Sequence, residues 1–230
     1  TRRLKWPDDY FILSQQFSYK HYFLNNYTSL TSYFTNGHSN DLAYSVGFSR
    51  TSLDSPIYPR SGSEVSVQGF VTPPYSLLSG KDYSAIEVSD RYKWLEYYKI
   101  NVRGSWMLNL IGDVVLNARF RFGYMGYYNR DIGLSPFGRY YVGGDGLSSW
   151  VLDGREVVPL RGYQNARLSP DDGASIFDRY TLELRQPIIE SASITAYILG
   201  FLEGGNSWSS IKQFQPFKMY NSAGVGVRLY

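Results

Sequence analysis

The stretch Leu116-Asn117-Ala118-Arg119-Phe120-Arg121-Phe122-Gly123-Tyr124 alternates between two kinds of side chain. Apolar residues occupy the even-numbered positions, and polar residues or glycine lie between them. Successive side chains of a β-strand point to opposite faces of a sheet, so this period of two predicts a strand with one apolar face and one cationic face. Burying an unpaired charge costs several kcal/mol, so the cationic face must lie against water or acidic partners.

The same alternation recurs along the chain. Eight strands are predicted, near residues 9–20, 42–49, 64–69, 98–108, 116–124, 180–185, 194–203 and 222–229. No helical pattern of comparable length accompanies them, and no window holds eighteen consecutive apolar residues, which argues against a transmembrane helix. A membrane-spanning β-barrel remains compatible, because each of its strands needs only about 9 to 11 residues.

The predicted connections alternate between long and short. Long ones follow residues 22, 73, 126 and 208, and short ones lie at 56–62, 112–113 and 187–191. Antiparallel strands place successive connections at opposite ends of a sheet, so one end carries tight turns and the other carries elaborate loops. Transmembrane barrels have this asymmetry, with short periplasmic turns and longer extracellular loops.

The polar faces of these strands are strongly charged. They carry Lys20, Lys99, Arg103, Arg119, Arg121, Arg185 and Arg228 against Glu64, Glu183 and Glu203. A wide, wet lumen accepts such a set. A soluble β-sandwich with one solvated face explains the alternation equally well, but it does not explain the asymmetry of the loops.

Composition narrows the class of protein further. The formal charge of +3 is too small to indicate a nucleic-acid partner, and the absence of cysteine excludes disulfides and thiol chemistry. The 22 Tyr, 13 Phe and 5 Trp occur beside a negative mean hydropathy, a combination that suits aromatic side chains at a water boundary. Residues 1–6 lead into no apolar core of the length a signal peptide requires. Either the mature protein starts here or, as we expect, this sequence is a piece of a longer protein.

The connection from about Gly126 to Phe177 is far longer than the usual 4 to 6 residues or so. It contains the segment Val158-Pro159-Leu160-Arg161-Gly162-Tyr163 and many apolar residues. A solvated tail would carry fewer of them, so we expect this connection to pack against the rest of the protein.

The chain resembles the C-terminal barrel of the BamA-type outer-membrane assembly and translocation family. The residues that carry the resemblance are Arg161-Gly162-Tyr163, which match the family's Arg-Gly-aromatic motif, and Tyr140-Tyr141-Val142-Gly143-Gly144, which match the segment leading into it. Further matches are Leu182-Glu183-Leu184, the segment 201–208, the segment 222–227 and the turn 56–62. Together they cover nearly the whole chain.

The resemblance implies an all-β fold, an antiparallel transmembrane β-barrel of sixteen strands. Residues 1–230 would form a partial barrel domain with the seventh to the fourteenth strand, and 127–176 would be a long extracellular loop that folds inward. The periplasmic domains and the seam between first and last strands would lie outside this chain. Glu203 departs from the family, which usually has an aspartate there.

Strand parity places Glu183 and Glu203 on the lumen side of neighbouring strands. The hypothesis is that the long loop folds into the barrel and Arg161 binds both carboxylates, for which its planar guanidinium is suited. Gly162 would allow a close backbone approach, and Tyr163 would pack on the wall. Loss of Arg161 would then leave two carboxylates unpaired, at about 3 to 5 kcal/mol if burial is deep.

Simpler interpretations remain open. Arg161 can be a solvated loop residue, and the two glutamates can be solvated lumen carboxylates. No substrate cleft supports a glycosidase pair, and no nucleophile has a base at recognisable spacing, so no enzyme is predicted. His21 and His38, in or beside a predicted loop, lack ligand spacing for a metal. Gly224 and Gly226 fit small lumen-facing residues better than a dinucleotide loop.

The predicted function is therefore insertion of β-barrel proteins into the bacterial outer membrane, without a cofactor. The resemblance implies unfolded barrel clients, accessory outer-membrane lipoproteins and outer-membrane lipid as partners. Three alternatives stay open: a related pore that secretes polypeptides, a passive porin whose basic lumen selects anions, and a barrel enzyme such as a lipase or protease.

Overall fold

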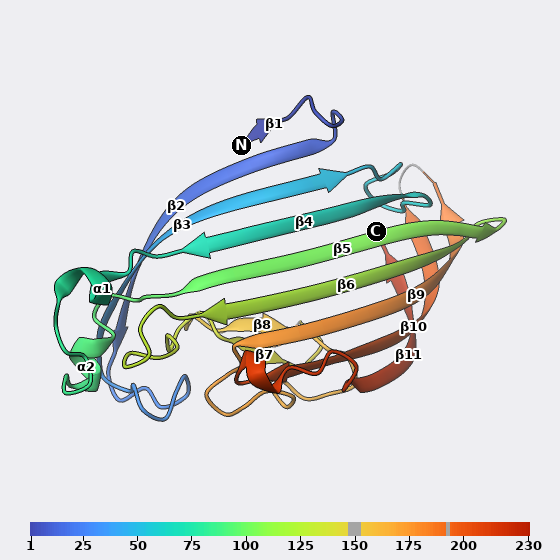
Figure 1. Ribbon diagram of the computed structural model, residues 1–230. Helices are drawn as coiled ribbons and strands as arrows, with labels where there is room; N and C mark the ends of the chain where they lie inside the picture. The colour runs from blue at the N-terminus through green and yellow to red at the C-terminus, as the bar shows by residue number, and fades with distance from the viewer. Residues whose placement is uncertain (147–152, 192–193) are drawn as a thin grey trace.

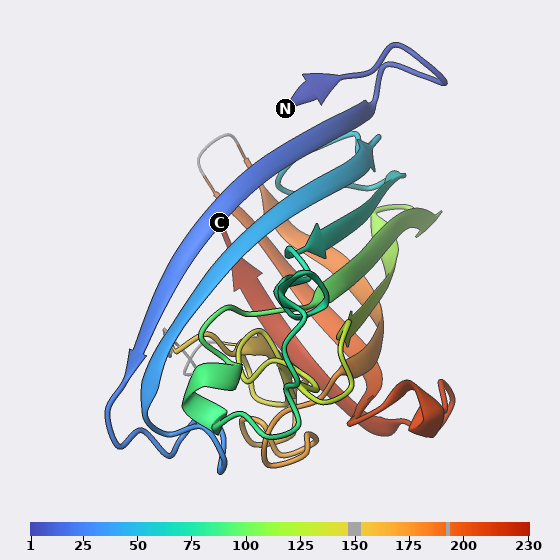
Figure 2. The ribbon, with the colours of Figure 1, turned by 60° about the vertical axis from the view of Figure 1, so that its left-hand side comes forward.

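The computed structural model describes residues 1–146, 153–191 and 194–230. In these ranges nine antiparallel strands form one sheet, in the order β1-β2-β3-β4-β5-β6-β9-β10-β11. The strands are β1 Arg2–Arg3, β2 Phe11–Leu24, β3 Gly37–Thr51, β4 Gly62–Val71, β5 Tyr98–Ile111, β6 Val114–Gly126, β9 Ile176–Glu190, β10 Thr195–Trp208 and β11 Tyr220–Leu229. The sheet curves strongly around one side, as the two views show (Figures 1 and 2). We call its concave side the lumen.

The eight long strands coincide with the eight that the alternation predicts, so the prediction of an antiparallel all-β fold is confirmed. In the described part of this sheet only β1 is additional, and its two residues pair with Leu13 and Ile12 of β2. The connections also follow the prediction. The short connection 52–61 between β3 and β4 and the tight turn 112–113 between β5 and β6 lie at one end of the sheet, and the longer loops lie at the other end (Figure 1).

The long loops contain little helix. The structure has α1 Tyr75–Ser79 and α2 Val88–Arg91 between β4 and β5, and the 3-10 turn η1 Ile211–Gln213 between β10 and β11. None of the helices in the described ranges has the length and apolar character needed to cross a bilayer.

The two faces of the sheet differ as the sequence predicts. On β9 and β10, Leu184 and Leu202 are exposed on the convex side, at 47% and 60%. Between such residues, Glu183 and Glu203 point into the lumen and are at most 3% exposed. An apolar convex face is the arrangement expected of a wall in contact with lipid, with polar side chains on the inner face.

The predicted break at 187–191 is shorter in the structure than the sequence indicates. Pro187 was predicted in a break but lies within β9, next to a register shift between Ala196 and Tyr197 of β10. The pairing of β9 with β6 ends at Arg185, so no ladder bond on that side requires the N–H that proline lacks.

His38 was predicted inside a polar loop and His21 beside it, and the placement of His38 was wrong. His21 lies in β2 and His38 in β3, because the ladder between these strands continues to Leu24 and Gly37. The polar residues at 38–40 hid this extension, since hydrophobic alternation fades there.

Candidate functional site

The described parts of the long connection, 127–146 and 153–175, lie on the lumen side of the sheet (Figure 2), and Ile176 already belongs to β9. Two three-residue strands, β7 Tyr140–Val142 and β8 Glu156–Val158, pair in parallel within it. Phe137 stacks on Tyr22 of β2 with ring centroids 3.9 Å apart, while the following Arg-Gly-Tyr segment contacts β10 and β11. The loop therefore reaches from one wall of the curved sheet to the other.

Arg161 enters the lumen and contacts both predicted carboxylates. Its Nε and Nη2 donate to Oε1 of Glu203 at 3.0 and 2.6 Å, and Nη2 lies 3.4 Å from Oε2 of Glu183. Its backbone N–H donates to the other oxygen of Glu203 at 3.1 Å. The guanidinium also lies over the ring of Phe201, with its Cζ 3.5 Å from the ring centroid. Arg161 thus combines its charge, its planar fork of donors and its stacking on a ring, whereas a lysine would keep the charge but lose the planar fork and the stacking of planes.

The two glutamates have more cationic partners than the sequence analysis assigned. Glu203 also accepts from Arg179 Nη2 at 2.7 Å. Glu183 accepts from Arg185 Nε at 2.7 Å and from Arg119 Nη2 at 3.0 Å, and Arg228 lies 3.7 Å away. The expectation that loss of Arg161 leaves both carboxylates unpaired is therefore wrong. That expectation assumed one cation for the two carboxylates, whereas five arginines lie 3.7 Å or less from them in the lumen.

Gly162 and Tyr163 continue from Arg161 along β11. Gly162 has φ +88°, a region that favours glycine, and a Cβ placed there would lie 3.1 Å from Cβ of Ser222. The Tyr163 hydroxyl donates to the carbonyl of Asn221 at 2.8 Å, and its ring meets Tyr220 edge-on. The structure thus places the backbone of the motif close to the wall and the aromatic ring against it.

Gly143 and Gly144 bind the backbone of the same segment. Gly143 N–H donates to the carbonyl of Val158 at 3.0 Å, and Gly144 N–H donates to that of Tyr163 at 3.0 Å. The carbonyl of Gly144 in turn accepts from Leu160 N–H at 3.0 Å. Both glycines have positive φ, +129° and +87°, so the turn after β7 fixes where Arg161 leaves the loop.

A family model for the Omp85 superfamily domain matches residues 2–230. The chain belongs to the Omp85 superfamily. Among solved structures, it is similar to the crystal structure of BamA from Haemophilus ducreyi lacking POTRA domains 1–3, with a TM-score of 0.64 and 17% sequence identity. The alignment covers 96% of this chain and 45% of that one, so the chain spans less than half of the BamA chain. No curated protein matches.

The BamA-type resemblance and the barrel fold inferred from it are confirmed by these two comparisons. The nine-stranded sheet of this Omp85 chain corresponds to part of the BamA barrel and does not close on itself. Membership of the superfamily supports an outer-membrane protein of the assembly and secretion class. The role of the Arg-Gly-Tyr segment stays a prediction, now with a defined geometry.

The loop of this Omp85 chain has a second attachment that was not predicted from the sequence. Lys99 on β5 donates to Oε2 of Glu156 on β8 at 2.5 Å and to the carbonyl of Gly138 at 2.6 Å. Asn101, two residues further along β5, accepts from the Tyr140 hydroxyl at 2.5 Å. Burial raises the pKa of Tyr140, and the charge of Glu156 raises it further, so the phenol keeps the proton it donates.

Arg179 was also missed, although its signal was present. It lies two residues before Thr181 and therefore shares the lumen parity of Glu183, but the predicted strand began at residue 180. The partnership of Lys99 with Glu156 had no comparable signal, because 57 positions separate the two residues. Within the described ranges, no cluster of three metal-ligating side chains occurs, and His21 faces only His38 and Asn40.

Proposed function

We propose that this chain is part of an insertase that folds β-barrel proteins into the bacterial outer membrane. The observation that supports this most directly is the anchored loop. It carries the Arg-Gly-Tyr motif of an assembly family on an Omp85 sheet, and Arg161 binds Glu203 inside the lumen. A passive porin needs a free path along its lumen, so a loop that extends from β2 to β10 favours assembly over diffusion.

The proposed activity needs no nucleotide and no cofactor. Unpaired backbone groups of a client strand are costly in lipid, and each ladder bond that forms removes that cost. Client folding itself would then supply the free energy, and the protein would act by holding a curved template in place. Unfolded barrel proteins are the proposed clients, with accessory outer-membrane lipoproteins and surrounding lipid as further partners.

Depletion with complementation tests this proposal. The protein is depleted in its own bacterium and replaced by the wild type, by Arg161→Ala or by Arg167→Ala. Arg167 is the matched control because it lies in the same loop but is exposed. The readout is the amount of heat-modifiable β-barrel protein in the outer-membrane fraction.

We expect depletion to lower the level of folded barrel proteins, Arg167→Ala to restore it fully and Arg161→Ala to restore it only in part. Unchanged barrel proteins together with loss of one secreted polypeptide would assign the chain to secretion instead. Unchanged barrel proteins together with a large, stable anion-selective current from the reconstituted protein would assign it to the porin class.

A further inference from the structure

Three arginines form a row across adjacent strands of the lumen wall. In the ladder, Arg103 on β5 lies directly opposite Arg121 on β6, and Arg121 lies directly opposite Arg179 on β9. Side chains at directly opposite positions of an antiparallel pair have Cβ atoms about 4.5 to 5.5 Å apart, and like charges there are destabilising. Water or a nearby anion must therefore screen the repulsion within the row, and Arg103 is itself exposed.

The described residues pair little negative charge directly with this row. In the described part of the structure, only Arg179 of the three has an ion pair, with Glu203 at 2.7 Å. Arg103 donates to the neutral hydroxyl of Ser66 at 2.7 Å, and Arg121 has only a cation–π contact, 5.9 Å from the ring centroid of Phe177. The Nε of Arg179 is buried, and no described residue accepts its hydrogen bond.

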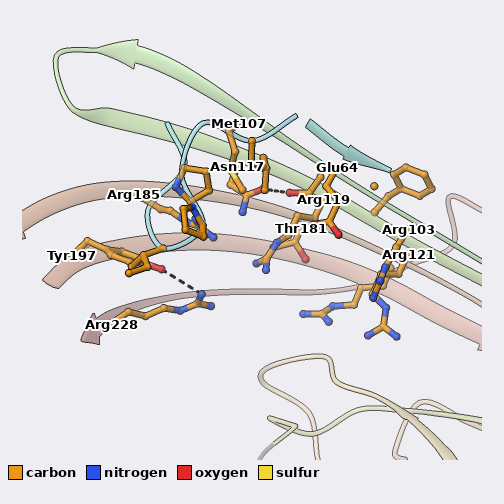
Figure 3. Close-up of a pocket in the computed structure, with 18 of the residues that line it drawn as sticks. Glu64, Arg103, Met107, Asn117, Arg119, Arg121, Thr181, Arg185, Tyr197 and Arg228 are labelled. Atoms are coloured by element: carbon orange, nitrogen blue, oxygen red, sulfur yellow. Dashed lines mark hydrogen bonds between the residues drawn. The ribbon is translucent and has the colours of Figure 1, made fainter. Parts of the chain in front are cut away.

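The row lines a cavity of about 340 Å³ between the sheet and the short turn after β3. Six arginines and one glutamate are among its lining residues, namely Arg103, Arg119, Arg121, Arg179, Arg185, Arg228 and Glu64. Figure 3 shows Arg103 and Arg121 side by side at one end, with Arg185, Tyr197 and Arg228 at the other. The cavity is thus large enough for a small ligand. Four of the six arginines pair with Glu183 or Glu203, so among the described residues its unpaired positive charge lies at Arg103 and Arg121.

We propose that the row Arg103-Arg121-Arg179 binds a soluble multivalent oxyanion of the phosphate class. Strands lie about 4.8 Å apart, so the row spans about 10 Å, which suits two linked phosphoryl groups better than a single small halide. Guanidinium groups bind phosphate oxygens in pairs of parallel hydrogen bonds, and a polyanion would remove the repulsion between neighbouring arginines. The row faces the lumen, on the side opposite the apolar convex face, so the ligand arrives from water. This inference does not depend on the insertase proposal.

Calorimetric titration with inorganic pyrophosphate, on the protein in an uncharged detergent, tests the site. We expect saturable one-to-one binding that Arg103→Gln and Arg121→Gln each weaken about tenfold, as loss of charge-assisted hydrogen bonds predicts. The matched control is Arg130→Gln, an exposed loop arginine outside the cavity, which should leave the affinity within about twofold of wild type. Heat-modifiable migration shows that each variant is folded.

The absence of saturable binding to the folded wild type would overturn the proposal, and so would equal weakening by Arg130→Gln. Absence of binding is also the result expected if a carboxylate from another part of the full-length protein occupies the row. A second arm repeats the titration in nanodiscs of zwitterionic lipid, with and without an anionic phospholipid. An unchanged affinity supports a soluble ligand, whereas competition by the anionic lipid would overturn that assignment in favour of a lipid headgroup.

Discussion

Substitution of Arg161 should weaken the attachment of the loop by an amount that follows from its contacts. Two charge-assisted hydrogen bonds to Glu203 are lost, and each is worth about 1.5 to 3 kcal/mol. The backbone bond to Glu203 survives, Arg179 still neutralises this carboxylate, and the Arg161 side chain is 24% exposed. We therefore expect Arg161→Ala to lower the stability of the attached loop by about 2 to 3 kcal/mol. This is less than the cost of leaving a buried carboxylate without any partner.

A buried reporter thiol measures this cost. The chain contains no cysteine, and Val158 on β8 is fully buried beside the motif, so Val158→Cys reacts with a maleimide only when the loop detaches. When opening and closing are fast, the labelling rate follows the open population. A cost of about 2 to 3 kcal/mol then raises the rate roughly 30- to 150-fold. Arg161→Lys keeps the charge but loses the planar fork, so its labelling rate should lie between those of the wild type and Arg161→Ala.

The exposed Arg167 again provides the control, since Arg167→Ala leaves the anchor intact and should label at the wild-type rate. An Arg161→Ala protein that labels no faster than wild type would show that the loop is held without this residue. Equal acceleration by Arg167→Ala would show that the assay reports general loosening of the loop.

Three further predictions use the same reporter. Arg179→Ala combined with Arg161→Ala should cost more than the two single changes added together, by about 1 to 3 kcal/mol, because Glu203 then loses both ion-pair partners; additive costs would contradict this. Lys99→Met should accelerate labelling about tenfold, because the ion pair between Lys99 and the partly exposed Glu156 on β8 is lost. Lys99→Arg keeps the charge and should restore most of the slow rate. Gly143→Ala should cost about 1 to 3 kcal/mol or more, because its φ is +129° and the new Cβ would overlap the carbonyl of Gln164; a folded variant with wild-type labelling would refute it.

The strands of the wall could be predicted because the alternation within each strand shows which of its side chains face the lumen. Parity alone assigns Glu183 and Glu203 to the lumen, and both lie there. Strand ends were less predictable, because polar residues near 38–40 and Pro187 resemble connections, although neighbouring ladders hold them in strands. The end of a strand depends on hydrogen bonds to its partner strand, and the sequence of one segment does not identify that partner.

The interior of the loop was beyond prediction for a different reason. Its strands β7 and β8 have three residues each, too short for any period to appear. The motif predicted where Arg161 would go, yet the stoichiometry of the site depended on Arg119, Arg179 and Arg185, which belong to the wall. Sequence spacing shows which side chains share a face, but the distances between them depend on strand register.

The two attachments of the loop act on different parts of the sheet. Glu156 binds Lys99 on β5, whereas Arg161 binds Glu203 on β10, and three strand boundaries separate β5 from β10 in the sheet order. A loop fixed at both points limits how far those strands can flatten, because flattening would lengthen the distance between the anchors. Either ion pair alone constrains the curvature less, although Phe137 still stacks on Tyr22 of β2 and Tyr163 still bonds to Asn221 of β11. The curvature of this wall should therefore depend on both ion pairs together, and a variant that lacks both should loosen the sheet far more than either single change.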